Sequence, residues 1–192
     1  GLLAETDGPY TGIGAAGSRR LAQTGFGQGA GSWNVSQAAR LVGAVANGGR
    51  YVRCPADMEL AAPCTTTELL QGGAGIEAIL AGMRGVMVSG TGRPLPAIPG
   101  VRVYGKTGTA DAPGTVDEAP WGIKRGATTA PHSWFVAIAE PESNPACGTA
   151  PGRYVVTAVV PHGGFGAAAA GPLAMAAIAA LGETGYFPAP VP

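Results

Sequence analysis

Charge is scarce in this sequence. Only 12% of its 192 residues are Asp, Glu, Lys or Arg, and the two signs cancel to a formal net charge of zero. Such a chain has no basic face for nucleic acid and no polybasic patch for anionic lipid. No apolar run approaches the roughly 20 residues needed to cross a bilayer, and Gly1–Glu5 lacks the basic start of a signal peptide. We therefore expect neither nucleic acid nor a membrane among the partners of this segment.

Cysteine is also sparse. The three cysteines, Cys54, Cys64 and Cys147, show no CxxC or His-paired spacing, so we expect no structural zinc, and nothing in the sequence indicates another metal or a cofactor. Cys54 and Cys64 flank a proline-containing segment and can form a disulfide bond in an oxidising compartment, with Cys147 left over. Three unpaired thiols are the alternative, and the sequence leaves both open.

Turn-forming residues are plentiful, with 33 glycines and 17 prolines, but a hydrophobic content of 46% argues against disorder. The first stretch, through Gly31, has few periodic apolar positions and predicts loops with at most one short helix. A chain of this length is expected to bury a single core.

Two helices are predicted in the first half of the chain. The first begins at Asn34, which can form a capping box with Gln37, and ends at Asn47–Gly49. Its predicted buried face consists of Ala38, Leu41, Val42 and Val45. The second ends at Ser89–Gly92. Its apolar positions are spaced three and four apart and predict one buried stripe of Ile76, Ile79, Leu80, Met83, Val86 and Met87.

Three strands and a closing helix are predicted in the second half. The β-rich segments are Val101–Tyr104, Ser133–Ala139 and Tyr154–Val160. Asp111–Pro131, between the first two strands, is longer than a hairpin needs. Pro172 is suited to the first position of the last helix, which should end before Gly182.

Tyr104–Ala110 is the most informative segment. It contains Lys106, one of only two lysines among twelve basic residues. Gly100–Thr107 matches the phosphate-loop pattern G-x-x-x-x-G-K-[ST], which requires a strand before the first glycine and a helix beginning at Lys-Thr. Here the β-rich run lies between the two glycines, and Gly108 and Pro113 follow where a helix should begin. Nucleotide binding therefore ranks third among our hypotheses.

Lys106-Thr107-Gly108 also resembles the third signature of the penicillin-interacting serine enzymes. The resemblance extends over nearly the whole chain, to a Gly-Gln-Gly loop, a capped helix, an Ala-Asn-Gly-Gly turn, the next helix and turn, the signature strand and the strand after it. The matching segments are, in order, Gly25–Gly29, Asn34–Arg40, Ala46–Gly49, Met83–Gly92, Gly105–Ala110 and Trp134–Val136. The chain looks like the carboxy-terminal part of a penicillin-binding protein transpeptidase domain.

The nucleophile of this family is the serine of Ser-x-x-Lys, and no serine in this sequence has a lysine three residues later. Ser32-Trp33-Asn34 spells the second signature, Ser-x-Asn, but lies between the Gly-Gln-Gly loop and its helix, past the family's place for that motif. Asn34 is already explained as a helix cap, so we interpret this match as coincidence. We expect the chain to begin after both signatures and to be inactive by itself.

The resemblance implies a role for each residue of the signature strand. Lys106 would lie near the nucleophile's hydroxyl, and Thr107 and Thr109 would offer hydroxyls to the substrate's carboxylate. The Thr109 N–H would be one of two oxyanion donors. Lys106 and Thr109 are thus the catalytic candidates, and Lys106, Thr107, Gly108 and Thr109 the substrate-binding ones. The implied ligand is a peptidoglycan stem peptide or a β-lactam.

The implied fold is of the α/β class, α+β type: an antiparallel sheet flanked by helices in an incomplete transpeptidase/β-lactamase-like fold. Residues 1–192 would form the carboxy-terminal portion of one transpeptidase domain, mainly helical over 1–98 and with three strands and a closing helix over 99–192. In the family, the strand matching Tyr154–Val160 pairs with a strand from before the nucleophile. Its edge should therefore be exposed, to pair with the missing half of the domain or with a second copy.

Two functions from different classes are retained. The first is the carboxy-terminal half of a peptidoglycan DD-transpeptidase, extracytoplasmic by resemblance and active only with its missing half. The second is a non-catalytic binding or interaction module derived from the same fold. His132 and His162 have no neighbouring ligand residue in the sequence and are expected to be structural. Asp111 and Asp117-Glu118 should face water.

Overall fold

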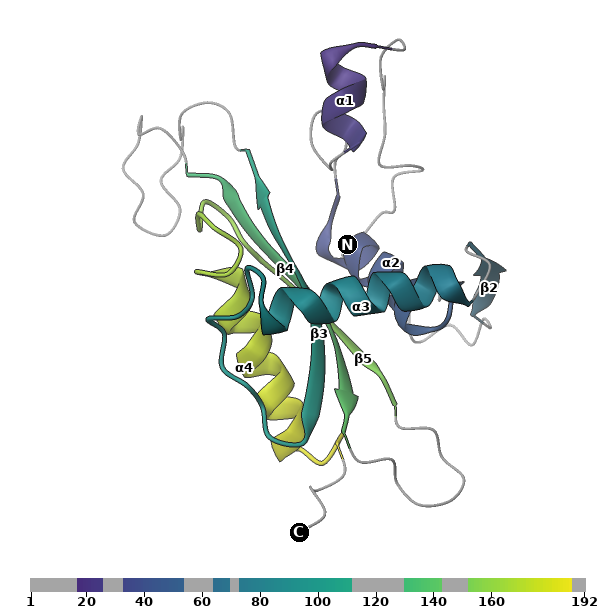
Figure 1. Cartoon of the computed structure of the whole chain (residues 1–192), viewed down its shortest axis with the longest axis vertical. Coiled ribbons are helices and arrows are strands. Elements are labelled where there is room, and N and C mark those ends of the chain that lie inside the picture. Colours follow the sequence, from purple (N-terminus) through teal and green to yellow (C-terminus); the bar gives the residue numbers. More distant parts are fainter. Residues whose placement is uncertain are drawn as a thin grey trace.

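The computed structural model describes residues 17–25, 33–53, 64–69, 73–111, 130–142 and 152–187. The elements lie in the order α1 (Arg19–Gly25), α2 (Val35–Ala46), β1 (Arg50–Arg53), β2 (Thr65–Glu68), α3 (Ala74–Val88), β3 (Val101–Ala110), β4 (His132–Pro141), β5 (Tyr154–Val160) and α4 (Ala170–Glu183). In Figure 1, α3 crosses the sheet, α4 runs along it, and α1 stands apart. None of the helices in these ranges has the length and apolar character needed to cross a membrane. The predicted α+β class with an antiparallel sheet and flanking helices is confirmed.

The main sheet has the order β3-β4-β5, and both pairings are antiparallel. All three predicted strands are present, but β3 continues to Ala110 instead of ending at Tyr104. The whole length of β3 pairs with the long apolar strand β4, and this pairing carries the extended backbone through its glycines and threonines. Val101–Tyr104 and the signature strand Gly105–Ala110 expected from the resemblance are therefore one continuous strand.

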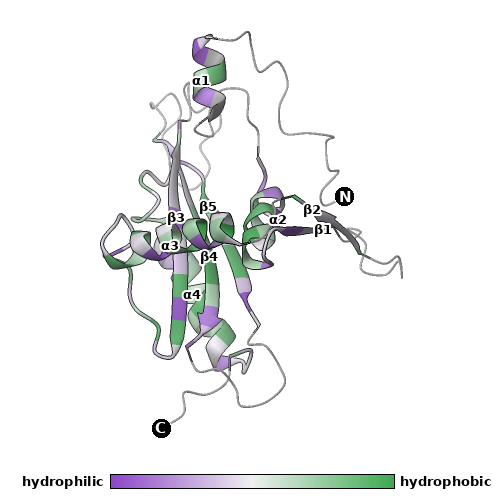
Figure 2. Cartoon of the chain, turned by 45° about the vertical axis from the view of Figure 1, so that its right-hand side comes forward, coloured by the Kyte–Doolittle hydropathy of each residue, from purple (hydrophilic) through white to green (hydrophobic). Residues whose placement is uncertain are grey.

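Helices cover both faces of the sheet. On one face, Val103 and Phe135 pack with Met175 and Ile178 of α4. On the other face, Tyr104 and Ile138 pack with Val45 of α2 and Met83 of α3. Figure 2 shows hydrophobic residues along β4 and β5, between these helices. Phe135, Ile138, Met175 and Ile178 are among the largest fully buried side chains of the described residues, so the centre of the core is at β4.

The capping box predicted for α2 is present. Gln37 N donates to Asn34 Oδ1 at 2.8 Å, and Asn34 N donates to Gln37 Oε1 at 3.0 Å. The helix ends before Asn47, where Gly48 and Gly49 adopt positive φ angles of 67° and 96°. The predicted buried face was wrong at Leu41, whose side chain is 44% exposed.

Two other helix predictions need correction. In α3, Ile76 and Met83 are buried, but Ile79 is 41% exposed, so the buried stripe is narrower than predicted. α4 begins at Ala170 and not at Pro172, and it includes Gly182. Pro172 still lies in the first turn, where the backbone N–H has no intrahelical partner to lose.

β1 and β2 form a separate antiparallel hairpin in which Arg53 pairs with Thr65. From the sequence alone, Tyr51-Val52-Arg53 can be a short extended segment, and nothing indicates the second strand. All four side chains of β2 are exposed, so it has no apolar alternation that could have revealed it. Cys64, directly before β2, is disulfide-bonded, and Cys54 and Cys147 lie outside the described residues.

Ile138 provides a test of where the core lies. Ile138→Ala should lower the free energy of unfolding by about 2–5 kcal/mol, because a fully buried side chain leaves a cavity. Ile79→Ala is the matched control and should cost less than about 1 kcal/mol, because its side chain is partly in water. Urea unfolding of both variants gives the comparison. Equal losses would contradict this account of the core.

Candidate active site

The edge of β3 that faces away from β4 forms the candidate site. Two contacts show which backbone groups point to that edge. Gly100 O accepts the N–H of Glu142 at 2.9 Å, so Gly100 faces the β4 side of the ladder. Val103 O accepts Nη1 of Arg84 from α3 at 3.2 Å and thus faces the opposite side. Residues at even and odd positions of β3 therefore face different edges.

The same alternation determines where the backbone groups of the signature residues point. In an antiparallel pair, successive residues alternate between hydrogen-bonded and non-hydrogen-bonded positions, and the register of β3 with β4 is unbroken. The backbone N–H and C=O groups of Gly105, Thr107 and Thr109 accordingly point away from β4, as those of Val103 do. Among the described strands, β3 pairs with β4 alone.

Lys106 places a positive charge at this edge. Its side chain is exposed, and Nζ donates to Thr107 O at 2.6 Å. Because Thr107 O points away from β4, the ammonium group lies beside the outward-facing backbone. An anionic ligand approaching the edge would meet both a cation and backbone N–H donors.

Thr91 is a site residue that the sequence analysis did not single out. It lies in the turn after α3, and its Oγ1 is 2.8 Å from Oγ1 of Thr107. The turn was predicted only as the end of a helix. Its position in a segment that resembles the family was the available signal, but its contact with Thr107 depends on how α3 crosses β3.

The two glycines of the signature strand allow close packing. A Cβ on Gly105 would lie 2.6 Å from Met87 Sδ and 2.7 Å from Phe135 Cζ. A Cβ on Gly108 would lie 3.0 Å from Cβ of Trp134, its cross-strand partner. Side chains at these positions would force Met87, Phe135 or Trp134 to shift, so the glycines allow these side chains to pack closely on β3.

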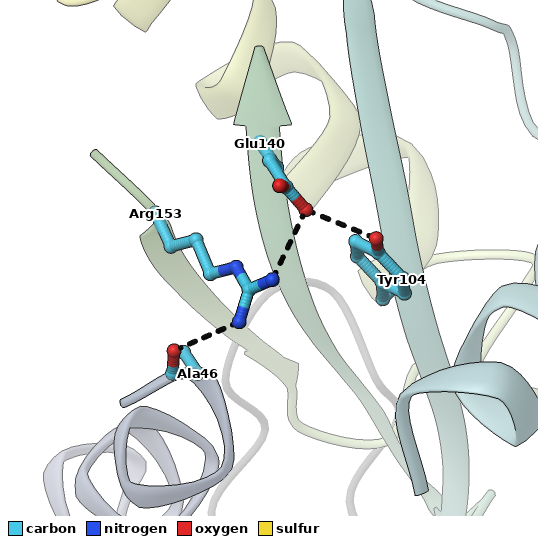
Figure 3. A network of polar contacts seen from close by, with 4 residues as sticks. All are labelled: Ala46, Tyr104, Glu140 and Arg153. Carbon is cyan, nitrogen blue, oxygen red and sulfur yellow. Dashed lines mark hydrogen bonds and ion pairs between the residues drawn. The ribbon is translucent and has the colours of Figure 1, made fainter. Parts of the chain in front are cut away.

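A polar network connects the start of the signature strand to α2 (Figure 3). Tyr104 OH donates to Glu140 Oε2 at 2.9 Å, and Arg153 Nη2 lies 3.5 Å from the same oxygen. Arg153 Nη1 also donates to Ala46 O at 3.1 Å, at the end of α2. The network therefore links β3, β4, the residue before β5 and the end of α2. Its member on β3, Tyr104, directly precedes Gly105.

His132 and His162, which nothing in the sequence indicated as a pair, are neighbours in space. Their ring centroids are 4.6 Å apart, and His162 N donates to His132 Nδ1 at 3.1 Å. The antiparallel pairing of β4 with β5 brings the start of one strand next to the end of the other. Burial lowers the pKa of His132 below 6.5, and the charge of His162 lowers it further.

The other candidates are less informative. Asp111 is exposed at the end of β3, as expected, whereas Asp117, Glu118 and Ser32 lie outside the described residues. In the ranges that the structure describes, no three His, Cys, Asp or Glu side chains gather where they could hold a metal ion.

No helix begins at Lys106-Thr107, because β3 runs unbroken from Val101 to Ala110. The phosphate-loop geometry is therefore absent.

An antiparallel sheet between helices, with Lys-Thr-Gly on an edge strand, is the arrangement of a transpeptidase-type fold. The family model described as the penicillin binding protein transpeptidase domain matches residues 4–179. The chain belongs to this family, which confirms the resemblance found in the sequence.

Two solved structures share the fold. The crystal structure of PBPA from Mycobacterium tuberculosis is 23% identical with a TM-score of 0.59, over 93% of this chain and 43% of that one. The apo structure of the transpeptidase domain of Burkholderia pseudomallei penicillin-binding protein 3 is 21% identical with a TM-score of 0.56, over 91% of this chain and 50% of that one. This chain thus spans half or less of each. No curated protein sequence matches it.

The histidine pair predicts a specific pH dependence. A lowered pKa in the folded state means that the unfolded chain binds the His132 proton more readily. The contribution of His132 to stability should therefore be complete above the ordinary pKa of 6.5 and fall as the pH drops from 6.5 toward the lower, folded-state pKa. His132→Asn keeps a hydrogen-bond acceptor but does not titrate.

The measurement is urea unfolding of the parent and His132→Asn chains at about pH 7.5 and about pH 5.5, on either side of the ordinary histidine pKa. The parent should lose more stability on acidification than the variant. An equal loss in both chains would show that His132 does not contribute.

Proposed function

We propose that this chain is the carboxy-terminal half of a peptidoglycan DD-transpeptidase domain and that the edge of β3 binds the substrate's carboxylate. The carrying observation is the outward orientation of the Thr107 and Thr109 backbones beside the Lys106 ammonium. Lys106, Thr107, Gly108 and Thr109 form the substrate-binding edge in this proposal, with Lys106 and Thr109 also serving the chemistry. The substrate is a peptidoglycan stem peptide, and a β-lactam takes its place.

Each of these residues has a distinct chemical role in the proposal. The Lys106 ammonium neutralises the substrate's carboxylate and polarises the nucleophile's hydroxyl. Since Thr91 and Thr107 share one hydrogen bond, the hydroxyl that accepts it keeps its own proton for a carboxylate oxygen. The Thr109 N–H stabilises the oxyanion of the acyl-transfer intermediate, and losing such a donor typically costs about 2.7–4 kcal/mol.

The nucleophile must come from elsewhere, because none of the 192 residues forms a Ser-x-x-Lys. The sheet supports this part of the proposal. Val136 and Thr157, which stand in register with Lys106, are only half-buried, whereas Phe135 and Ala137 on the α4 face are fully buried. A further segment packed over this row would cover it and bring a nucleophile close to Lys106.

The edge of β5 is the second proposed contact. β5 pairs with β4 on one side and with no other described strand, and such an edge is a template for pairing. We propose that its partner is a strand from the missing half of the domain, with a second copy of the chain as the alternative. Residues 1–192 would thus make up the carboxy-terminal portion of a single transpeptidase domain.

The proposed location is the periplasm or the outer face of the cell membrane. Penicillin-binding protein transpeptidases are normally extracytoplasmic. The disulfide bond at Cys64 supports the same location, because such bonds persist in oxidising compartments.

A second candidate function is a non-catalytic binding or interaction module. It is favoured by the missing Ser-x-x-Lys, since a module that only binds carboxylates could keep the β3 edge without a nucleophile. The two candidates differ in what a completed domain does: the transpeptidase forms an acyl-enzyme with a penicillin, and the module binds the penicillin without forming a covalent bond.

The chain alone should not form a stable adduct with a fluorescent penicillin. It lacks the nucleophile, so no labelled band should survive denaturing electrophoresis, even after long incubation. A complete penicillin-binding protein labelled in the same tube is the positive control. A labelled band from this chain would overturn the proposal that the nucleophile comes from outside these 192 residues.

The β5 edge should make the chain associate in the absence of a partner, which sedimentation over a range of concentrations can measure. Thr157→Pro should reduce this association. By the alternation along β4, the Thr157 N–H points away from β4, so proline blocks pairing at the edge while sparing the ladder. Thr157→Val keeps the N–H and is the control. A parent chain that stays monomeric throughout would count against the edge as a contact.

A further inference from the structure

A turn between β5 and α4 touches the back of the candidate site. Gly166 in this turn lies against the backbone of Gly108 and Trp134, which form a hydrogen-bonded pair in the ladder of β3 with β4. A Cβ on Gly166 would lie 2.5 Å from Trp134 O, 2.8 Å from Gly108 O and 2.9 Å from Gly108 N. Real Cβ atoms essentially never approach below 3.0 Å. Only glycine therefore allows the turn to support β3 at this point.

Ser133 holds this turn in place. Ser133 is the one buried polar or charged residue recorded for the described part of the chain, with 0% exposure. Its Oγ donates to Phe165 O at 3.0 Å and accepts the N–H of Ala170 at 3.0 Å. One hydroxyl thus connects β4 both to the turn and to the first residue of α4.

The same hydroxyl replaces a helix cap. The N-cap residue of α4 is Ala169, which has no side chain that could accept the first helical N–H groups. Ser133 Oγ takes the N–H of Ala170, and Gly166 O takes the N–H of Gly171 at 2.8 Å. The start of α4, the turn and β4 are therefore held as one unit.

This unit lies directly behind the proposed oxyanion donor. Ser133 is the cross-strand partner of Thr109, and Trp134 is the partner of Gly108. Gly108 stands between Thr107 and Thr109, whose backbones face the edge of β3 away from β4. If a side chain at position 166 displaced Gly108, Thr107 and Thr109 would move with it. The groups of a binding site must stay within roughly 0.5 Å of their productive positions.

We propose that Ser133 and Gly166 are positioning residues for the substrate-binding edge: Ser133 fixes the turn from β4, and Gly166 supports Gly108 from the α4 face. That the edge binds substrate rests on the proposed transpeptidase function. That Ser133 and Gly166 fix the position of Gly108 does not rest on it, so the two statements can be tested separately.

The first test measures hydrogen exchange in the chain itself by NMR, comparing the amide of Gly108 with that of Ala137. Both amides belong to the ladders of β4, but only Gly108 contacts Gly166. Ser133→Ala should accelerate exchange at Gly108 relative to Ala137 at least about tenfold, since it leaves the part-buried Phe165 carbonyl and the buried Ala170 N–H without their partner. Ser133→Cys, a weaker hydrogen-bonding isostere, should restore part of the protection.

Gly166→Ala should raise the same exchange ratio, because its Cβ cannot fit against the Gly108–Trp134 pair. Gly182→Ala is the matched glycine control, since its Cβ would meet only Phe187 at an ordinary 3.7 Å. Ser18→Ala is the matched serine control, because Ser18 Oγ also accepts a helix N–H, that of Leu21 at 3.2 Å. Both controls should leave the ratio unchanged.

An equal acceleration at Gly108 and Ala137 in the Ser133 and Gly166 variants would show general destabilisation and overturn the proposal. Unchanged exchange at Gly108 would overturn it as well. If Ser133→Ala does not fold, Ser133→Cys and Gly166→Ala still decide between these outcomes.

The second test titrates the parent chain with benzylpenicillin and follows the amide shifts of Thr107 and Thr109. These shifts should appear in the parent and in both controls, and should be lost or much reduced in Ser133→Ala and Gly166→Ala. No shift in the parent would count against the proposed function of the edge, while the exchange ratio would still decide on the coupling. Shifts that are the same in all chains would overturn the positioning role.

Discussion

The rest of the structure depends on the antiparallel ladder between β3 and β4. All ten residues of β3 stand opposite a residue of β4, without a bulge. This register determines that the backbone groups of Gly105, Thr107 and Thr109 face the edge of β3 away from β4. It also gives Lys106 a strand conformation, although threonine and glycine alternate around it. A shift of one residue would turn the Thr109 N–H toward β4 and remove it from the edge.

Close packing keeps this register in place from three directions. Met87 of α3 and Phe135 approach Gly105, Trp134 approaches Gly108, and the turn at Gly166 lies on the backbone of the same pair. At Gly166 the close atoms belong to the backbone, so a side chain cannot fit there, whereas at Gly105 and Gly108 a side chain would force neighbouring side chains to shift. The glycines of this region are therefore better explained by the approach of neighbouring atoms than by turn formation, and their replacement would affect the position of the edge before it affected the fold.

Features that depend on short-range physics could be predicted from the sequence. The capping box of Asn34 and Gln37 and the apolar strand β4 depend on neighbours a few residues away or on a regular period. Contacts between distant segments could not be predicted in this way. Thr91 meets Thr107 because α3 crosses β3, and His132 meets His162 because β4 and β5 are antiparallel. The β-rich pattern alone indicated a strand only to Tyr104, whereas its continuation to Ala110 was expected from the family resemblance and depends on pairing with β4. Ser133 gave no signal either, because its two partners lie more than thirty residues away.

The two faces of the sheet differ in a way that bears on function. On the α4 face, Phe135 and Ala137 are completely buried, and Ser133 satisfies its hydrogen bonds there. On the opposite face, Tyr104 and Ile138 are covered by α2 and α3, but Val136 and Thr157 beside Lys106 are only half-buried. Burial of apolar surface drives packing, so this half-buried row can accept contact with a further segment. Such a segment would meet the sheet next to Lys106, where a transpeptidase needs its nucleophile. The complete face would then hold the substrate edge rigid, and the incomplete face would receive the reacting group.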